Sequence, residues 1–281
     1  MTSVATVPVL RRQERFASVG STNDVVRAWL AAGDPEICVA VADEQTAGRG
    51  RNGRTWTAPP GAGLLLSLGF RPTWLAPERA WQLAATTSLA MADAIEDVAG
   101  LEFNSVQLKW PNDLVMPGGA DDRSITPPGP HRDLRKLAGV LGETEGLGTD
   151  DPRVVIGIGL NADWPATAFP TELAATMTSV RAATGDRPID VERLLRAFLV
   201  ELEAGIQELH AGRFASVGWV GRQATTGRLL DLVLPDGTVE RVGGRGVDPV
   251  SGALRIVDPV TGGTERAVYV GEITHVRLAA V

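Results

Sequence analysis

The sequence predicts an α+β protein in which a mixed-sheet domain is followed by a small all-β domain. Strand-length apolar runs and helical stretches follow one another without strict alternation up to about residue 220. Beyond that point only short strand candidates remain, separated by turn signals such as Pro235-Asp236-Gly237. We therefore expect an N-terminal tail at residues 1–15, a first domain at 16–220 and a second at 221–281.

Periodicity and breaker residues place the elements of the first domain. Ser21 begins a Ser-x-x-acid helix start and Gly33 ends that helix, whereas Pro77 opens and Gly100 closes a second one. A third helix follows the apolar spacing of residues 194–209. The strand candidates are residues 37–42, 64–70, 106–110, 137–143 and 154–160.

One segment is too rich in glycine and proline for a regular element. It contains Met116-Pro117-Gly118-Gly119 and Pro127-Pro128-Gly129-Pro130. Such clusters of breakers mark loops. We interpret residues 116–135 as an exposed, flexible insertion.

Composition excludes several classes of protein. The 281 residues are 44% hydrophobic, enough for a sizeable core, and a net charge of −7 argues against a whole-surface nucleic-acid binder. The single cysteine, Cys38, sits in an apolar run and is expected to be a buried, inert thiol. No signal peptide, no apolar run of membrane-spanning length and no zinc-ligand spacing occurs, so we expect a cytoplasmic protein.

The most informative segment is residues 48–54, which place three glycines and three arginines within seven residues. Glycine lets backbone N–H groups approach a ligand closely, and guanidinium groups supply forked donors for phosphate or carboxylate. The segment is therefore a candidate anion cradle between two core strands. A solvated basic loop, or one that binds RNA, is the alternative.

Four further segments accompany this loop: Ser21-Thr22-Asn23, Lys109-Trp110-Pro111-Asn112-Asp113, Lys136-Leu137-Ala138-Gly139 and Gly157-Ile158-Gly159-Leu160-Asn161. With Gln45, and in this order, they resemble the biotin protein ligase family over roughly residues 16–281. The resemblance implies a mixed-sheet catalytic domain of the biotin/lipoate ligase type and a small SH3-like β-barrel. It also implies a ligase that makes biotinyl-5′-AMP from biotin and ATP and then biotinylates a carrier lysine.

The resemblance also assigns residues. Lys136, Arg51 and Asp113 are the expected catalytic residues. The implied biotin-binding residues are Ser21, Thr22, Asn23, Gln45, Gly48, Arg49, Gly50, Arg51, Lys136, Gly139 and Gly159. The implied residues for ATP and the adenylate are Arg49, Arg51, Arg54, Trp56, Asn112, Lys136 and Asn161.

Several of these residues have simpler explanations. Ser21 could only cap its helix, Trp56 could pack in the core, and Lys136 could form a surface ion pair. Lys109 could serve only as an ion-pair partner. The loop is expected to close over the reactive adenylate, with its arginines retaining that intermediate.

Substrates and partners follow from the same resemblance. ATP would bring Mg²⁺ on its phosphates, without a metal cage of protein ligands, and the partner would be the biotin carboxyl carrier domain of a carboxylase. Only 20 residues precede Ser21, so we expect no DNA-binding domain and no DNA partner. We also expect no membrane partner and a monomer or weak homodimer. A lipoate ligase and a non-enzymatic RNA-binding module are the alternative functions.

Overall fold

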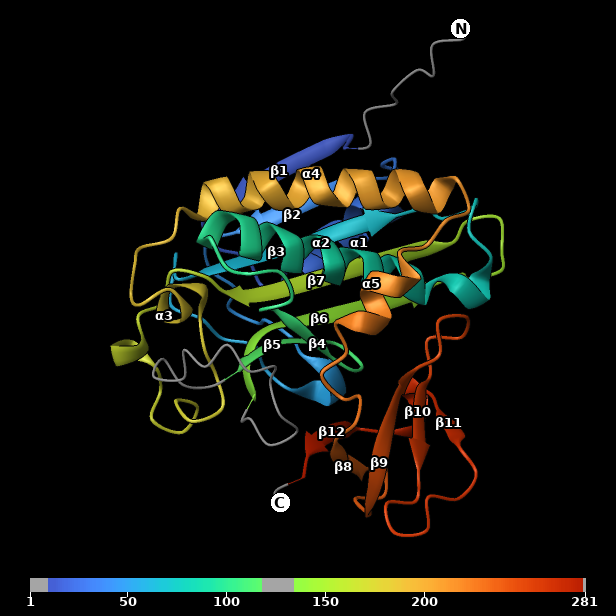
Figure 1. The fold of residues 1–281 in the computed structure, drawn as a ribbon. Helices are drawn as coiled ribbons and strands as arrows, with labels where there is room; N and C mark the ends of the chain where they lie inside the picture. The colour runs from blue at the N-terminus through green and yellow to red at the C-terminus, as the bar shows by residue number, and fades with distance from the viewer. Residues whose placement is uncertain (1–9, 118–133, 280–281) are drawn as a thin grey trace, which may run out of the picture.

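The computed structural model describes residues 10–117 and 134–279, which form two sheets and their covering helices (Figure 1). The strands of the first sheet are β1 (Arg12–Phe16), β2 (Cys38–Ala42), β3 (Gly63–Phe70), β4 (Gln107–Lys109), β5 (Asp113–Pro117), β6 (Leu134–Glu145) and β7 (Arg153–Asn161). The α-helices are α1 (Thr22–Ala31), α2 (Trp81–Ala99), α3 (Val180–Ala183), α4 (Val191–His210) and α5 (Ser216–Gly221). The short 3₁₀ turns are η1 (Arg51–Gly53), η2 (Pro77–Arg79), η3 (Ala166–Ala168) and η4 (Val270–Glu272).

The first sheet is mixed, in the order β1-β2-β3-β7-β6-β5-β4. Strands β1 and β2 run parallel, and the remaining neighbours are antiparallel. Helices α2 and α4 cover one face, and α1 packs on the other (Figure 1). The predicted mixed-sheet α+β class is therefore confirmed.

The predicted helices are present, but Pro77 opens the turn η2 and α2 begins only at Trp81. Helix α4 buries an apolar stripe that includes Leu195, Phe198 and Leu202, at the three-to-four-residue spacing of one helix face. Helix α2 is followed by Gly100 at φ 66°, a left-handed conformation that glycine adopts at little cost. Cys38 is fully buried, and burial raises the pKa of its thiol to about 11, so the thiol stays protonated.

Two predicted boundaries need correction. Residues 12–15, expected in the N-terminal tail, belong to β1, which pairs with β2 along its whole length. Strand β1 is polar because it is an edge strand with an exposed face, so its sequence lacks the apolar run of a central strand. Residues 116–117 end β5 and residues 134–135 begin β6, so the predicted insertion of 116–135 is too long at both ends. Its remaining residues, 118–133, lie outside the described part of the chain.

The C-terminal part is a five-stranded antiparallel sheet in the order β11-β10-β9-β8-β12, compatible with the predicted SH3-like domain. Its strands are β8 (Leu229–Val233), β9 (Val239–Val247), β10 (Leu254–Val257), β11 (Arg266–Val268) and β12 (His275–Leu278). The linker to this domain pairs with β4: Leu108 N–H donates to Arg222 O and Ala224 N–H donates to Leu108 O, both at 2.8 Å. Trp110 Nε1 also donates to Gly252 O at 3.0 Å, so the two domains are in direct contact. No helix in the described ranges is both long and apolar enough to cross a bilayer.

Candidate active site

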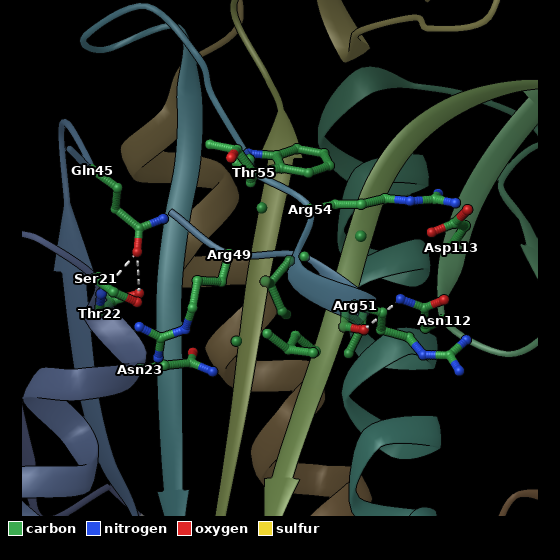
Figure 2. Close-up of a pocket in the computed structure, with 18 of the residues that line it drawn as sticks. Ser21, Thr22, Asn23, Gln45, Arg49, Arg51, Arg54, Thr55, Asn112 and Asp113 are labelled. Carbon is green, nitrogen blue, oxygen red and sulfur yellow. Dashed lines mark hydrogen bonds between the residues drawn. The ribbon is translucent and has the colours of Figure 1, made fainter. Parts of the chain in front are cut away.

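A pocket lies on the α1 face of the mixed sheet, beneath the loop that contains the glycines and arginines (Figure 2). Gln45, Ser21, Thr22 and Asn23 stand on one side of it, and Arg54, Asn112 and Asp113 stand on the other (Figure 2). The C-terminal domain also reaches the pocket, because Thr274 and His275 line it. Segments far apart in the sequence thus form one site.

One end of the pocket is a chain of neutral polar groups. Gln45 Oε1 accepts from the Thr22 backbone N–H at 2.8 Å and from Thr22 Oγ1 at 3.1 Å. Ser67 Oγ lies 2.7 Å from Thr22 Oγ1 and donates to Asn23 Oδ1 at 2.5 Å. Because these bonds use the oxygen of Gln45, its Nε2 amide group remains a donor at the pocket.

Ser21 lines this end without capping its helix. It is the N-cap residue of α1, yet its side chain forms no capping hydrogen bond and it is buried. The explanation of Ser21 as a helix cap alone is therefore wrong. Its hydroxyl can serve a ligand.

The floor of the pocket is made of glycine. Gly139 on β6 pairs with Gly159 on β7, and Gly157 lies two residues along the same strand. A Cβ on Gly159 would come within 2.4 Å of the Trp56 indole, and one on Gly157 within 2.2 Å of Asn23 Oδ1. These positions must lack side chains if Trp56 and Asn23 are to lie flat against the sheet. Trp56 is thus part of the pocket wall and not of the core.

The other end of the pocket is cationic and is organised by Asp113. Lys136 Nζ lies 2.7 Å from Asp113 Oδ1, and Lys109 Nζ lies 3.7 Å from Asp113 Oδ2. Burial lowers the pKa of Lys109, although the nearby Asp113 carboxylate opposes that effect. Lys136 is the more exposed lysine and its ammonium sits 5.3 Å from the centre of the Trp56 ring. Lys109 is an ion-pair partner, as one reading of the sequence suggested.

The loop is a small hairpin between β2 and β3 that contacts the C-terminal domain. Within it, Gly50 N–H donates to Arg54 O at 2.7 Å and Trp56 N–H donates to Gly48 O at 2.9 Å. Asn52, with φ 56°, takes the left-handed conformation that asparagine tolerates, and its Nδ2 donates to Thr274 O at 2.7 Å.

Two arginines of this hairpin also face the C-terminal domain. Arg51 Nη2 donates to the backbone oxygens of Val270 and Ile273, and Arg54 Nη1 lies 3.4 Å from His275 Nδ1. Burial, followed by the nearby Lys109 and Arg54 charges, lowers the pKa of His275 to about 4. His275 is therefore neutral at neutral pH and able to accept a hydrogen bond from Arg54.

The structure brings most of the predicted site residues together. The predicted residues that line the pocket are Ser21, Thr22, Asn23, Gln45, Arg49, Gly50, Arg51, Arg54, Trp56, Asn112, Asp113, Lys136, Gly139 and Gly159. Gly48 is not among the lining residues but is needed beside them, because a Cβ there would meet Trp56 O at 2.4 Å. Asn161 does not line the pocket either: it is buried, and its Nδ2 donates to Thr178 O at 2.9 Å.

Sequence reasoning did not predict several residues in or beside this site, among them Ser67, Glu143, Thr274 and His275. One signal was available for Ser67, because a serine interrupts the apolar run of β3. No local signal assigned a role in the pocket to the other three. Their contribution depends on strand register and on the contact between domains.

Comparisons with known proteins agree with this architecture. Residues 16–161 match the model of the Biotin/lipoate A/B protein ligase family. The chain therefore belongs to the biotin/lipoate A/B protein ligase family.

Two full-length relatives carry the name biotin–[acetyl-CoA-carboxylase] ligase. The one from Mycobacterium tuberculosis is 33% identical, over 95% of this chain and 90% of that protein. The one from Paracoccus denitrificans is 32% identical, over 82% and 88%.

A solved structure shares the fold over nearly the whole chain. The biotin protein ligase from Aquifex aeolicus, in complex with biotin and ATP, superposes with a TM-score of 0.74 and 22% identity. The alignment covers 96% of this chain and 100% of that one. This chain therefore shares the fold of that structure over nearly its whole length.

Proposed function

We propose that this protein is an ATP-dependent biotin ligase that forms biotinyl-5′-AMP and passes biotin to a lysine of a carboxylase carrier domain. One observation carries the proposal: a single pocket joins neutral polar groups to a lysine–arginine cluster across a glycine floor. The first end suits an uncharged polar head group, the second suits carboxylate and phosphate, and the floor admits the chain between them. The full-length relatives named as biotin ligases support this assignment.

The polar end favours biotin over lipoate. A ureido group offers one carbonyl oxygen and two N–H groups, and Gln45 Nε2 and the Ser21 hydroxyl are available beside Thr22 and Asn23. A dithiolane ring would leave these buried groups without partners, and unpaired buried polar groups disfavour binding. The lipoate alternative is thus the weaker of the two.

The cationic end of the pocket can offset the charge repulsion between the biotin carboxylate and the ATP phosphates in the first reaction step. A biotin carboxylate oxygen attacks the α-phosphorus of ATP, the bond to the bridging oxygen breaks, and pyrophosphate leaves with that oxygen. Both reactants are anions, so the ammonium of Lys136 and the guanidinium of Arg51 are placed to offset the charge between them. Neither an oxidant nor a covalent enzyme intermediate is needed.

Magnesium fits this site as a companion of ATP and not as a resident ion. In the two described ranges of the chain, no three His, Cys, Asp or Glu side chains gather to hold a metal. The Asp113 carboxylate already faces two lysines. A Mg²⁺ bound by ATP phosphates and water matches the usual preference of that ion and would supply further charge neutralisation.

The second step transfers the acyl group to an amine. The carrier lysine must lose a proton before its nitrogen attacks the carbonyl carbon of the adenylate, which expels AMP. Asp113 is a carboxylate at the pocket and is suited to attract the lysine ammonium and to assist its deprotonation. The RNA-binding alternative has no comparable support, since the loop arginines contact groups of the protein itself.

Pyrophosphate exchange tests the proposal directly. Purified protein with ATP and Mg²⁺ should exchange labelled pyrophosphate into ATP when biotin is added, and much more slowly when lipoate is added. Exchange with lipoate alone would replace biotin with lipoate as the substrate. No exchange with either acid, from protein that circular dichroism shows to be folded, would contradict the proposed function.

Ser67→Ala is expected to raise the KM for biotin by about tenfold, because it removes the hydroxyl that donates to the buried Asn23 Oδ1. The KM for ATP and kcat should change little, since Ser67 is remote from the cationic end. Thr87→Val is the matched control: that threonine is buried on α2 and its hydroxyl donates to Leu83 O of the same helix. Equal rises in the KM values for biotin and ATP would contradict this role for Ser67.

A further inference from the structure

The three arginines of the loop differ in the groups that they contact. Arg49 forms a two-pronged ion pair with Asp24 of α1, with Nη1–Oδ2 and Nη2–Oδ1 both at 2.7 Å. The contacts of Arg51 and Arg54 are backbone oxygens and the neutral ring of His275. Among the residues that the structure describes, neither of these two arginines has an ion pair with a carboxylate. The anion-binding charge of the loop therefore belongs to Arg51 and Arg54.

Asp24 belongs to a balanced cluster of four charges next to the polar end of the pocket. Arg27 Nη1 lies 2.5 Å from Asp24 Oδ1 and Arg27 Nη2 lies 2.6 Å from Glu143 Oε2. Glu143 Oε2 also accepts from Asn23 Nδ2 at 2.8 Å. The Arg49 and Arg27 side chains together lower the pKa of Asp24 to about 2, so Asp24 stays ionised throughout the physiological range. Arg49 Nη2 also lies 3.6 Å from Glu143 Oε1, so two cations face two carboxylates.

The hairpin couples the position of Arg49 to the positions of the other loop residues. Arg49 pairs with Thr55 across the hairpin, and the neighbouring Trp56 rests on the glycine floor. A hairpin closed by such hydrogen bonds moves as a unit, so its attachment at Arg49 also places Trp56, Arg51 and Arg54. The Asp24 carboxylate directly follows Asn23, which ties this attachment to the polar end.

We infer that the Arg49 side chain fastens the loop to α1 through Asp24 and does not itself bind the anionic part of the substrates. Asp24 is accordingly a positioning residue for the ligase reaction. This inference rests on the proposed function. It divides the predicted roles of the arginines, giving Arg49 to loop placement and leaving Arg51 and Arg54 for the carboxylate and phosphates.

A double-mutant cycle in the pyrophosphate-exchange assay tests the inference. Asp24→Asn and Arg49→Gln should each raise the KM for biotin by about fivefold, the scale of a partly exposed two-pronged ion pair, with kcat nearly unchanged. The double variant should show no further rise beyond Arg49→Gln alone, because that change already removes the two-pronged pair. A direct anion ligand predicts otherwise: Arg49→Gln would cost about thirtyfold or more, also in the Asp24→Asn background, and this result would overturn the inference.

Hydrogen exchange of the ligand-free protein supplies a second measurement that needs no ligase activity. Backbone amides of residues 48–56 should exchange severalfold faster in each of the three variants than in the wild type. Glu208→Gln is the matched control, because it breaks a similar exposed, two-pronged pair with Arg213 far from the loop. That control should leave loop exchange and the KM for biotin unchanged.

The two hypotheses fail separately. A wild-type protein that shows no biotin-dependent exchange of pyrophosphate would overturn the proposed function, while hydrogen exchange still tests the attachment of the loop. Unchanged loop protection in Asp24→Asn and Arg49→Gln would overturn the attachment, whatever the activity.

Discussion

Lys136→Ala is expected to slow biotin-dependent pyrophosphate exchange by about 10²–10³-fold, the usual cost of removing a group that stabilises developing charge. Lys136 stands at the edge of the glycine floor, within ion-pair distance of Asp113. Both of its backbone polar groups are held by one neighbouring segment: Lys136 N–H donates to Thr176 O at 2.7 Å, and Thr178 N–H donates to Lys136 O at 2.9 Å. The alanine variant should therefore keep the strand while losing the ammonium.

The two half-reactions distinguish a charge effect from a general loss of structure. When biotinyl-5′-AMP is supplied, the Lys136→Ala enzyme should transfer biotin to a carrier domain with a much smaller defect, because two separate anions need no longer be brought together. An unchanged melting temperature would show that the fold is intact. Wild-type exchange by this variant would refute the central role of Lys136.

Arg222→Ala is expected to lower the free energy of unfolding by about 3–5 kcal/mol, because it leaves a buried carboxylate without its counter-charge. Arg222 is 2% exposed and Glu96 is 7% exposed. Arg222 Nη1 and Nη2 donate to the two Glu96 oxygens at 2.7 and 2.8 Å, and Nη1 also donates to Val106 O at 2.9 Å. The alanine variant breaks all of these bonds at the junction of the two domains.

Chemical denaturation measures this loss, and a second variant identifies its cause. Arg222→Met combined with Glu96→Leu removes both charges and keeps the volume, so it should recover a large part of the lost stability. The exposed pair of Glu208 and Arg213 provides a comparison, since Glu208→Gln should change the free energy of unfolding by less than about 1 kcal/mol. A loss of that small size in Arg222→Ala would contradict the buried-charge explanation.

The sequence predicted those elements whose signals are local. Helices α2 and α4 carry their apolar spacing, and the glycine at position 100 ends α2 in the expected left-handed conformation. Strand β1 was missed because an exposed edge strand needs no apolar pattern. Strand β5 was not predicted, because a breaker-rich run follows it directly and the insertion was placed from residue 116 onward. Leu114 and Val115 of this strand are nevertheless buried.

The predictions for the site divide in the same way, between residues with a local sequence signal and residues without one. Pocket residues that lie in short motifs, such as Ser21 and Lys136, were identified from the motifs and by resemblance. Ser67 lies at the polar end of the pocket because of the register of β3. His275 lies near Arg54 because the C-terminal domain contacts the loop. The pairing of Arg49 with Asp24 was also beyond local reasoning, since 25 residues separate the two. These contacts are products of the tertiary fold.

The linker that pairs with β4 has a consequence for how the sheet is shielded from other molecules. The seven-stranded sheet has two outer strands. Strand β1 carries exposed charges, including Glu14 and Arg15, which discourage pairing with a foreign strand. Strand β4 instead has the N–H and C=O of Leu108 occupied by Arg222 and Ala224. A fragment that stopped before Arg222 would bare these two groups on the outer strand β4, at its buried residue Leu108. The C-terminal domain is thus also tied to the solubility of the catalytic domain, because its linker closes an edge open to aggregation.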